Sequence, residues 1–186
     1  PLIEAISELS MSEDQISESI PVFFSDDATL AENLELSFTS SDETVIPLSG
    51  IRLAGEGASR SLTLEPVPNG FGLVEIGIQA VDQSGAIGHH SLSVTILAIN
   101  DPPRAENDVL VVDEDSDLID IDVLENDTFA PDTGEILIIE SVSLGSNGGR
   151  TEIRDDSVIY EPESNFFGEE TFDYVIGDGS GVTASA

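Results

Sequence analysis

Apolar and polar residues alternate along much of the chain. Over residues 74–80 every second residue is apolar, and those between are Glu, Gly and Gln. A period of two residues is typical of a β-strand with one buried face. Similar rows occur at residues 92–96, 119–123 and 172–176, and a nearly continuous apolar run covers 136–142. No window has a convincing apolar period of 3.6 residues, so we predict an all-β chain.

Turn-forming residues separate these rows. Many short strands with turn signals about every 8–12 residues are typical of a Greek-key β-sandwich. The glycine-rich residues 145–149 predict a hairpin turn.

Several motifs occur twice. Asp82 and Asp178 each follow an alternating row, precede a Ser-Gly turn and lie 96 positions apart (178 − 82). Glu13-Asp14 and Glu114-Asp115 are 101 apart (114 − 13). We therefore expect one sandwich repeated, with domains at residues 1–101 and 102–186. Asn100-Asp101-Pro102-Pro103 is the joint between them, and by the same offset the last strand of the second domain is expected to be cut short.

The charge and the amino-acid composition limit the kinds of partner and site that the chain can have. The net charge is −33, from 38 acids and five bases, and all five bases are arginine. Nucleic acids and anionic membranes are excluded as partners, because both are bound by clustered Lys and Arg. A hydrophobic fraction of 39% favours a folded chain. Cysteine is absent, so thiolate sites and disulfides are excluded. No apolar stretch is long enough to span a membrane.

The acids gather where loops should meet. Strands alternate in direction in a Greek-key sandwich, so its loops lie at two ends, and groups from both domains are expected at the joint. Carboxylate and amide oxygens in such number suit Ca²⁺, which takes about 6–8 oxygen ligands. The alternatives are that Asp and Asn only cap turns, or that the charge is an adaptation to salt. The predicted ligands at the joint are Glu13, Asp14, Glu65, Asn100, Asp101, Asn126, Asp127, Asp132 and Asp178. A second, incomplete calcium site is predicted at the start of the first domain, from Asp26, Asp27, Glu32 and Asp82.

These motifs resemble the cadherin-like and related Ig-like tandem repeats of large secreted, RTX-type bacterial adhesins. The resemblance covers nearly all of the second domain. It is carried by Asn100-Asp101-Pro102-Pro103, Glu114-Asp115, Val123-Leu124-Glu125-Asn126-Asp127, Tyr160-Glu161-Pro162, Asn165-Phe166-Phe167-Gly168 and the Phe172–Gly181 segment. The first domain looks like the dystroglycan-type cadherin-like variant, through residues 53–57 and 60–63. It departs from animal cadherins in carrying Glu65-Pro66 where they have Asp-Arg-Glu.

The resemblance implies an all-β chain of two tandem Greek-key Ig/cadherin-like sandwiches, joined by a short calcium-binding linker. Position by position, it implies that Glu13, Asn100, Asp101, Asp127, Asp132 and Asp178 hold calcium. The expected function is a calcium-dependent extender of a bacterial surface adhesin in attachment and biofilm formation, secreted or at the cell surface, and not an enzyme. Its expected partners are neighbouring repeats, a second copy, or a surface or host ligand. The alternatives are a module that binds a carbohydrate or protein, and an accessory domain of a secreted hydrolase.

Overall fold

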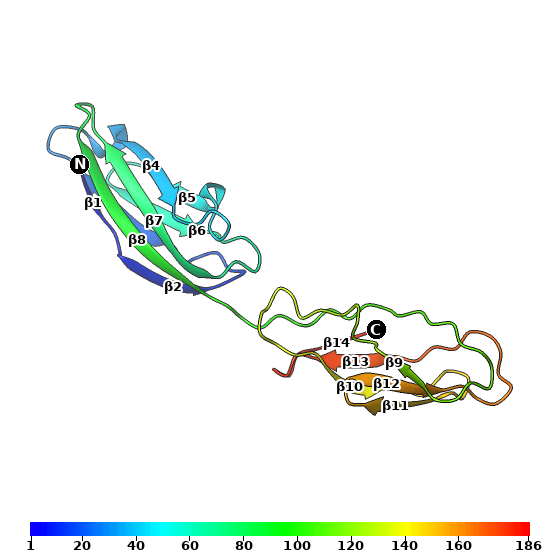
Figure 1. The fold of residues 1–186 in the computed structure, drawn as a ribbon. Helices are drawn as coiled ribbons and strands as arrows, with labels where there is room; N and C mark the ends of the chain where they lie inside the picture. The colour runs from blue at the N-terminus through cyan, green and yellow to red at the C-terminus, as the bar shows by residue number, and fades with distance from the viewer. The chain divides into compact units, whose positions relative to one another are not determined.

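The computed structural model describes all residues from 1 to 186 and divides into two compact units. Unit 1 is Pro1–Ile99 and unit 2 is Asn100–Ala186. The division falls two residues before the predicted one at 101/102. Both units are built from β-strands, with two short 3₁₀ turns in unit 1 (Figure 1).

Unit 1 is a sandwich of two four-stranded sheets, in the orders β1-β3-β6-β5 and β2-β8-β7-β4. All neighbouring strands are antiparallel except β2 and β8, which pair in parallel. The elements are β1 Leu2–Glu4, β2 Glu8–Ser12, β3 Ile20–Ser25, η1 Ala31–Asn33, β4 Glu35–Ser40, η2 Leu48–Gly50, β5 Ile51–Ala54, β6 Ser59–Leu64, β7 Gly72–Val81 and β8 Ile87–Leu97.

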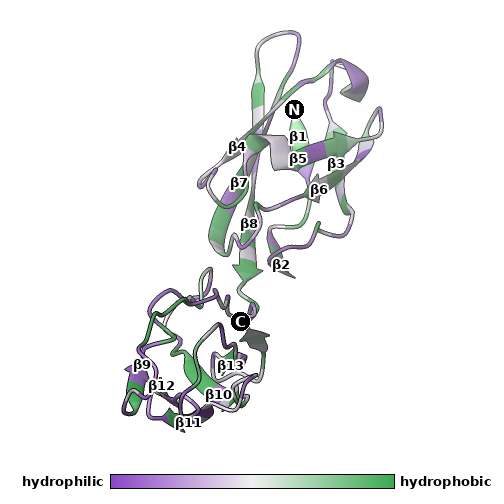
Figure 2. Ribbon diagram, turned by 90° about the vertical axis from the view of Figure 1, so that its right-hand side faces the viewer, coloured by the Kyte–Doolittle hydropathy of each residue, from purple (hydrophilic) through white to green (hydrophobic).

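The predicted alternation accounts for the core of unit 1. In β7 the residues Val74, Ile76, Ile78 and Ala80 are all buried, because successive side chains of a strand point to opposite faces. Figure 2 shows hydrophobic stretches along β7 and, in unit 2, along β10. Sixteen buried apolar residues from both sheets form one cluster, so the two sheets of unit 1 close around a continuous core.

Unit 2 repeats this plan with shorter strands, in sheets of order β11-β12-β9 and β10-β13-β14. Strands β9 to β14 take the places of β3 to β8. Ile176 pairs with Ala184, as Ala80 pairs with Gly88 in unit 1, so the last two strands of both units share one register at an offset of 96. The strands are β9 Ile119–Ile121, β10 Ile138–Val142, β11 Arg150–Arg154, β12 Ser157–Glu161, β13 Tyr174–Gly177 and β14 Thr183–Ser185.

The first segment of unit 2, residues 100–118, contains no β-strand. Arg104 and Thr128 form an isolated antiparallel bridge, which corresponds to the pairing of β1 with β3. The core is also smaller, with five buried apolar residues: Val123, Ile139, Val158, Tyr174 and Ile176.

The predicted all-β sandwich fold is confirmed, and each predicted row contains a strand. The predicted hairpin at residues 145–149 is wrong. A turn is present, since the Gly145 N–H donates to the Gly149 carbonyl at 2.9 Å. However, β10 before it and β11 after it belong to different sheets, so the turn carries the chain from one sheet to the other.

Candidate metal-binding loops

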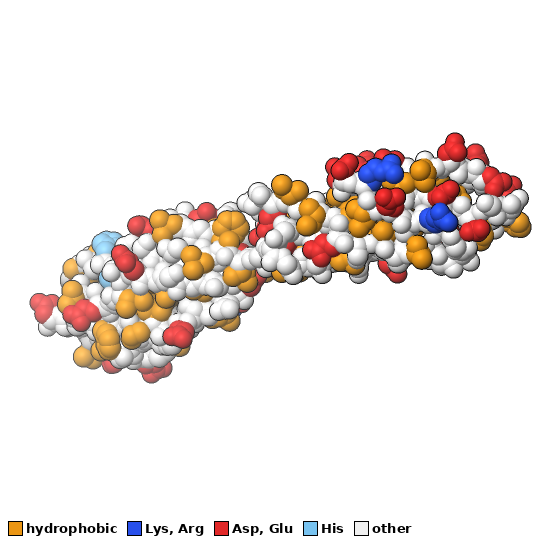
Figure 3. All heavy atoms as spheres, turned by 90° about the horizontal axis from the view of Figure 1, so that it is seen from below, with side chains coloured by type: hydrophobic (Ala, Val, Ile, Leu, Met, Phe, Trp, Pro, Cys, Tyr) orange, Lys and Arg blue, Asp and Glu red, His pale blue; other side chains and the backbone are white.

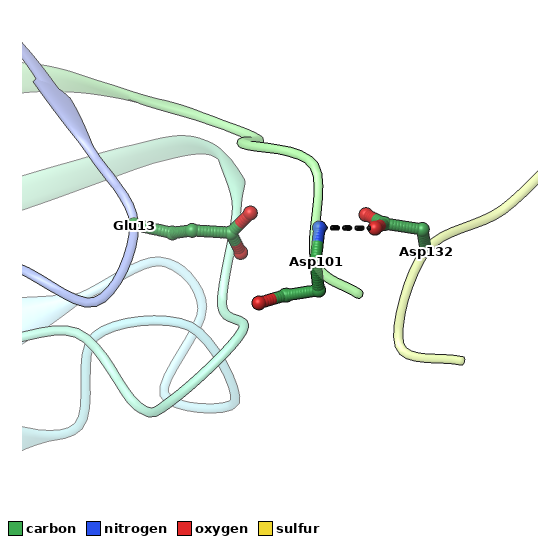
Figure 4. Close-up of side chains that lie close together, drawn as sticks. All are labelled: Glu13, Asp101 and Asp132. Carbon is green, nitrogen blue, oxygen red and sulfur yellow. Dashed lines mark hydrogen bonds between the residues drawn. The ribbon is translucent and has the colours of Figure 1, made fainter. Parts of the chain in front are cut away.

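Four of the predicted ligands meet at one end of unit 2. The Asn100 side-chain amide donates to Asp178 Oδ2 at 2.9 Å. The Asp101 N–H donates to Asp132 Oδ2 at 2.7 Å, the bond drawn dashed in Figure 4. A carboxylate oxygen of Asp101 and one of Asp132 lie within 4.8 Å of each other. The entering chain, the β9–β10 loop and the β13–β14 loop are thereby brought together.

The loop sequences explain why these carboxylates are fixed. Asp178 Oδ1 accepts both the N–H and the hydroxyl of Ser180, at 2.8 and 2.5 Å, so the Asp-x-Ser sequence closes its own turn. These bonds to Ser180, with that from Asn100, lower the pKa of Asp178 to about 2. The side chain is only 7% exposed, and it remains charged at neutral pH.

Glu135 belongs to the same group and was missed in the sequence. Burial raises its pKa, and the nearby carboxylates of Asp132 and Asp178 raise it further. Its Oε2 atom is buried and has no hydrogen-bond partner. Glu135 lies three residues after Asp132 in one loop, which is the signal that would have found it.

This donor set fits a hard divalent cation. Its groups are carboxylates and one amide, with no sulfur or imidazole, which favours Ca²⁺ or Mg²⁺ over Zn²⁺. The buried Glu135 Oε2 atom accepts no hydrogen bond, and the neighbouring carboxylates repel one another. A bound cation would offset both of these costs.

Two predicted ligands of unit 2 have other partners. Asp127 Oδ1 accepts the Glu106 N–H at 2.7 Å, and its carboxylate lies 3.1–3.3 Å from the Tyr174 hydroxyl. Asn126 is exposed and donates to the Asn107 carbonyl at 3.3 Å. The structure joins both residues to the first segment of unit 2, not to the hydrogen bonds among Asn100, Asp101, Asp132 and Asp178.

Glu13 is the most buried acid of unit 1, at 1% exposure. It follows β2, its N–H donates to the Leu97 carbonyl at 3.0 Å, and its Oε1 accepts the Ile99 N–H at 2.7 Å. Its Oε2 has no hydrogen-bond partner. Glu13 therefore fixes Ile99, the last residue of unit 1, directly before Asn100 in the chain. Its second carboxylate oxygen, Oε2, is left available to bind a cation.

Asp14 and Glu65 of unit 1 have local partners. Asp14 Oδ1 accepts the Asn69 N–H at 2.8 Å. Glu65 forms an exposed ion pair with Arg52 at 2.6 Å. These contacts account for the positions of both carboxylates without a metal. In each carboxylate the other oxygen is not used in the contact.

The second predicted site, at the other end of unit 1, is partly assembled. Asp26 accepts the Ala28 and Thr29 N–H groups and pairs with the Pro1 amino group at 3.0 Å, and the backbone bonds and this pair lower its pKa to about 2. Asp82 accepts from Ser84 and Ala86, as Asp178 accepts from Ser180. Asp27 and Asp82 are near enough to raise the pKa of the Pro1 amine, after Asp26. Glu32 is exposed on η1.

Beyond these loops the surface is acidic. Figure 3 shows acidic side chains scattered over the face in view of each unit, with few basic ones. Only two ion pairs between side chains form, Arg52–Glu65 and Arg104–Glu106.

Residues 100–186 match the sequence model of the bacterial Ig domain family. No curated protein matches the chain. Among solved structures, cadherin domains 3–6 of protocadherin gamma B2 match with a TM-score of 0.54 at 15% identity, over 99% of this chain and 45% of theirs. The human desmocollin-1 ectodomain matches at 17% identity over 96% of this chain and 34% of that one, with a TM-score of 0.47. The BIgI domain of the S. agalactiae beta protein, solved bound to CEACAM1, matches at 15% identity over 52% and 98%, with a TM-score of 0.33.

The two units thus have the fold of Ig-like and cadherin-like β-sandwiches. The chain spans about a third of the desmocollin ectodomain and under half of the protocadherin segment. None of its helices is long and apolar enough to cross a membrane.

Proposed function

We propose that this chain is a calcium-dependent extender segment of a bacterial surface adhesin, outside the cell and without catalytic activity. The observation that carries the proposal is the group at the start of unit 2. There Asn100 and Asp101, the first two residues after unit 1, are hydrogen-bonded to Asp178 and Asp132. A cation held by these loops would hold the linker itself.

Calcium is the proposed ion because the donors are oxygens in flexible loops. Mg²⁺ requires stricter octahedral geometry and keeps more of its waters. The residues that would hold Ca²⁺ are Asp101, Asp132, Glu135 and Asp178. Participation of Glu13, Asp14 and Glu65 in the same site remains a prediction. Affinity on the order of 10⁻⁴–10⁻³ M is expected, as for other extracellular modules.

The proposed effect of calcium is mechanical. Without the ion, the carboxylates around Asn100 and Asp101 repel one another, and the linker is free to change conformation. With the ion, the same groups attract it and the linker is fixed. A chain of such segments would then hold a distal binding domain away from the cell. Neighbouring repeats are the proposed partners, as is a second copy or a host ligand at the distal end.

Calorimetric titration with Ca²⁺ tests the site. Wild type should bind, and Asp132→Asn should weaken binding by about tenfold or more, because one charged ligand is lost. The matched control is Asp120→Asn, which removes the same charge from an exposed position on β9 and should leave affinity unchanged. Equal affinity in all three proteins would place the ion elsewhere.

Small-angle scattering tests the mechanical role. The distribution of distances within the particle should narrow when Ca²⁺ is added and broaden again with chelator. If calorimetry detects the ion but the scattering is unchanged, the chain binds calcium without being stiffened by it.

A further inference from the structure

Three of the five arginines have partners. Arg52 and Arg104 form ion pairs, and the Arg60 guanidinium donates to two backbone carbonyls. Arg150 and Arg154 are exposed, and neither side chain takes part in an ion pair or a hydrogen bond, although the chain has 38 acids. Both belong to strand β11, so this strand carries positive charge that no acid of its own unit pairs.

Strand β11 is an end strand of its sheet, and it lies at the margin of unit 2 in Figures 1 and 2. It pairs with β12 from Arg150↔Glu161 to Arg154↔Ser157, and its backbone makes no hydrogen bond on the other side. Alternate residues of such a strand direct their N–H and C=O groups away from the sheet. The open edge belongs to the fold, because β5, the counterpart of β11 in unit 1, is also an end strand.

The charge of β11 distinguishes it from the other edges. Among the two end strands of each sheet, only β5 and β11 contain more bases than acids. The base of β5 is Arg52, which is paired with Glu65. Acidic edges of two chains repel each other, and the whole chain has a net charge of −33. The edge of β11 is therefore the one at which a second copy meets the least repulsion.

The sequence of β11 is also complementary to itself. Its outward face carries Arg150, Glu152 and Arg154, whereas Ile153 packs partly buried against the core. Two antiparallel copies of the strand can be related by a two-fold axis that passes through one residue. With Ile153 on the axis, Glu152 of each copy lies opposite Arg154 of the other, and Arg150 lies opposite Asp156 of the adjoining turn. Each unpaired arginine then meets an acid.

The neighbouring registers are less favourable. With Glu152 on the axis, the two copies of Glu152 face each other and Arg150 faces Arg154, so like charges meet. With Thr151 on the axis, Gly149 would have to pair with the second copy. However, the Gly149 carbonyl already accepts the Gly145 N–H, and the Gly149 N–H donates to the Glu170 carboxylate. An axis between two residues would set inward side chains beside outward ones.

We propose that β11 is a self-recognition edge, at which two copies of this chain join their β11-β12-β9 sheets in antiparallel fashion about Ile153. The inference rests on the proposed function only in that a second copy is among the partners, because the contact itself uses no calcium. A contact over about five residues of each chain is small, so two single chains associate weakly. Many chains side by side on one surface would strengthen the association through multivalency.

Sedimentation equilibrium of the complete 186-residue protein tests the proposal. The buffer contains chelator and about 0.15 M salt, which screens the long-range repulsion between chains. Wild type should form a dimer as its concentration rises towards about 1 mM, the range of weak contacts. Glu152→Arg and Arg154→Glu should each weaken dimerisation about tenfold or more, because like charges then meet twice in every dimer.

Mixing the two variants should restore dimerisation, because the bases of one chain then face the acids of the other. Both substitutions in a single chain should restore it as well, which is specific to the register about Ile153. The matched control is Asp120→Arg, at an exposed position on β9 at the far edge of the same sheet. It changes the net charge as Glu152→Arg does and should leave dimerisation intact. If net charge alone controlled association, both variants would instead strengthen it.

Hydrogen exchange locates the contact. Alternate backbone amides of residues 150–154 should exchange more slowly in the dimer than in the dilute monomer. Absence of a wild-type dimer would overturn the proposal, as would a mixture of the variants that stays monomeric or a dimer in which the β11 amides are not protected. Because chelator is present throughout, each of these results leaves the proposed calcium site untouched, and loss of calcium binding would leave the dimer intact.

Discussion

Asp14 Oδ1 accepts the backbone N–H of Asn69 at 2.8 Å, across 55 residues of sequence. Both residues have positive φ, 58° and 57°, a conformation that Asp and Asn tolerate better than other side chains. Unit 2 repeats this contact between Asp115 and Asn165, with φ of 58° and 59°. The motif Glu-Asp and the later Asn therefore fasten one loop to another in each unit.

Replacing Asp115 with Ala should lower the free energy of unfolding of unit 2 by about 1 kcal/mol, because one hydrogen bond between loops is lost. Asp115→Asn keeps an acceptor oxygen and should cost less. Urea unfolding followed by tyrosine fluorescence measures this unit alone, since both tyrosines, Tyr160 and Tyr174, lie in unit 2 and the chain has no tryptophan.

The same contact gives a test for Asp14, which the sequence predicts to be a calcium ligand. If fastening Asn69 is its role, Asp14→Asn should leave the calorimetric Ca²⁺ affinity of the protein unchanged. A severalfold weaker affinity would show instead that Asp14 binds the ion with its second oxygen.

Glu135→Gln should have opposite effects with and without calcium. In chelator, unit 2 should become more stable, because the variant removes a buried charge that Asp132 and Asp178 repel. Ca²⁺ affinity should fall by about tenfold, because a ligand charge is lost. Tyrosine fluorescence in urea and calorimetry measure the two effects, and Glu152→Gln on the exposed face of β11 is the control. A variant with unchanged affinity would remove Glu135 from the proposed site.

The fold was predictable because it depends on periodicity and repetition. The row from Val74 to Ala80 needs only a two-residue period to define its buried face, and the repeat of Asp82 at Asp178 identifies the same loop in both units. The sheet crossing at residues 145–149 was not predictable, since a glycine-rich turn has the same sequence whether the next strand joins the same sheet or the other one.

The candidate site was predictable only to the level of loops. Sorting loops by strand direction correctly placed Asp101, Asp132 and Asp178 at one end of unit 2. It could not show which way each side chain turns. Asp127 lies in the expected loop, but it accepts from Glu106 and from the Tyr174 hydroxyl. Glu135, outside every repeated motif, lies near enough to Asp132 and Asp178 for their charges to raise its pKa, after burial.

Tyr174→Phe should destabilise unit 2 by about 2 kcal/mol, within the range for hydrogen bonds to charged groups. The Tyr174 hydroxyl, in a side chain only 3% exposed, lies 3.0–3.3 Å from the carbonyls of Glu106 and Val123 and the carboxylates of Asp108 and Asp127. Burial raises its pKa first, and the two carboxylates add to that, so the hydroxyl keeps its proton at any ordinary pH.

The effect of Tyr174→Phe should be localised. The hydroxyl is the group that joins β13 to residues 106–108, so amide exchange should accelerate mainly there and in the segment after it. Tyr160 remains as the fluorescent reporter in the variant. A uniform increase in exchange across unit 2 would mean that the hydroxyl stabilises the whole sandwich and not this attachment.

Acid should weaken unit 2 over a defined range of pH, in the presence of chelator. Asp178 has a pKa of about 2 in the folded chain, below its ordinary value of 3.8, chiefly because it accepts the Ser180 hydroxyl and the Asn100 amide. A folded pKa below the unfolded one means that the unfolded chain binds the proton first. The contribution of Asp178 is therefore complete above about pH 4 and is lost as the pH falls towards 2.

Asp178→Asn isolates this contribution from those of Asp108 and Glu135, whose raised pKa values act with the opposite sign. Between pH 4 and 2, the free energy of unfolding from tyrosine fluorescence should fall less steeply in the variant than in wild type. Asp120→Asn, at an exposed position, should follow the wild-type slope. Ser180→Ala removes the first of the two donors, so it should move the carboxyl titration of Asp178, followed by NMR, back towards 3.8. Parallel slopes in Asp178→Asn and wild type would mean that another carboxylate controls the acid unfolding of this unit.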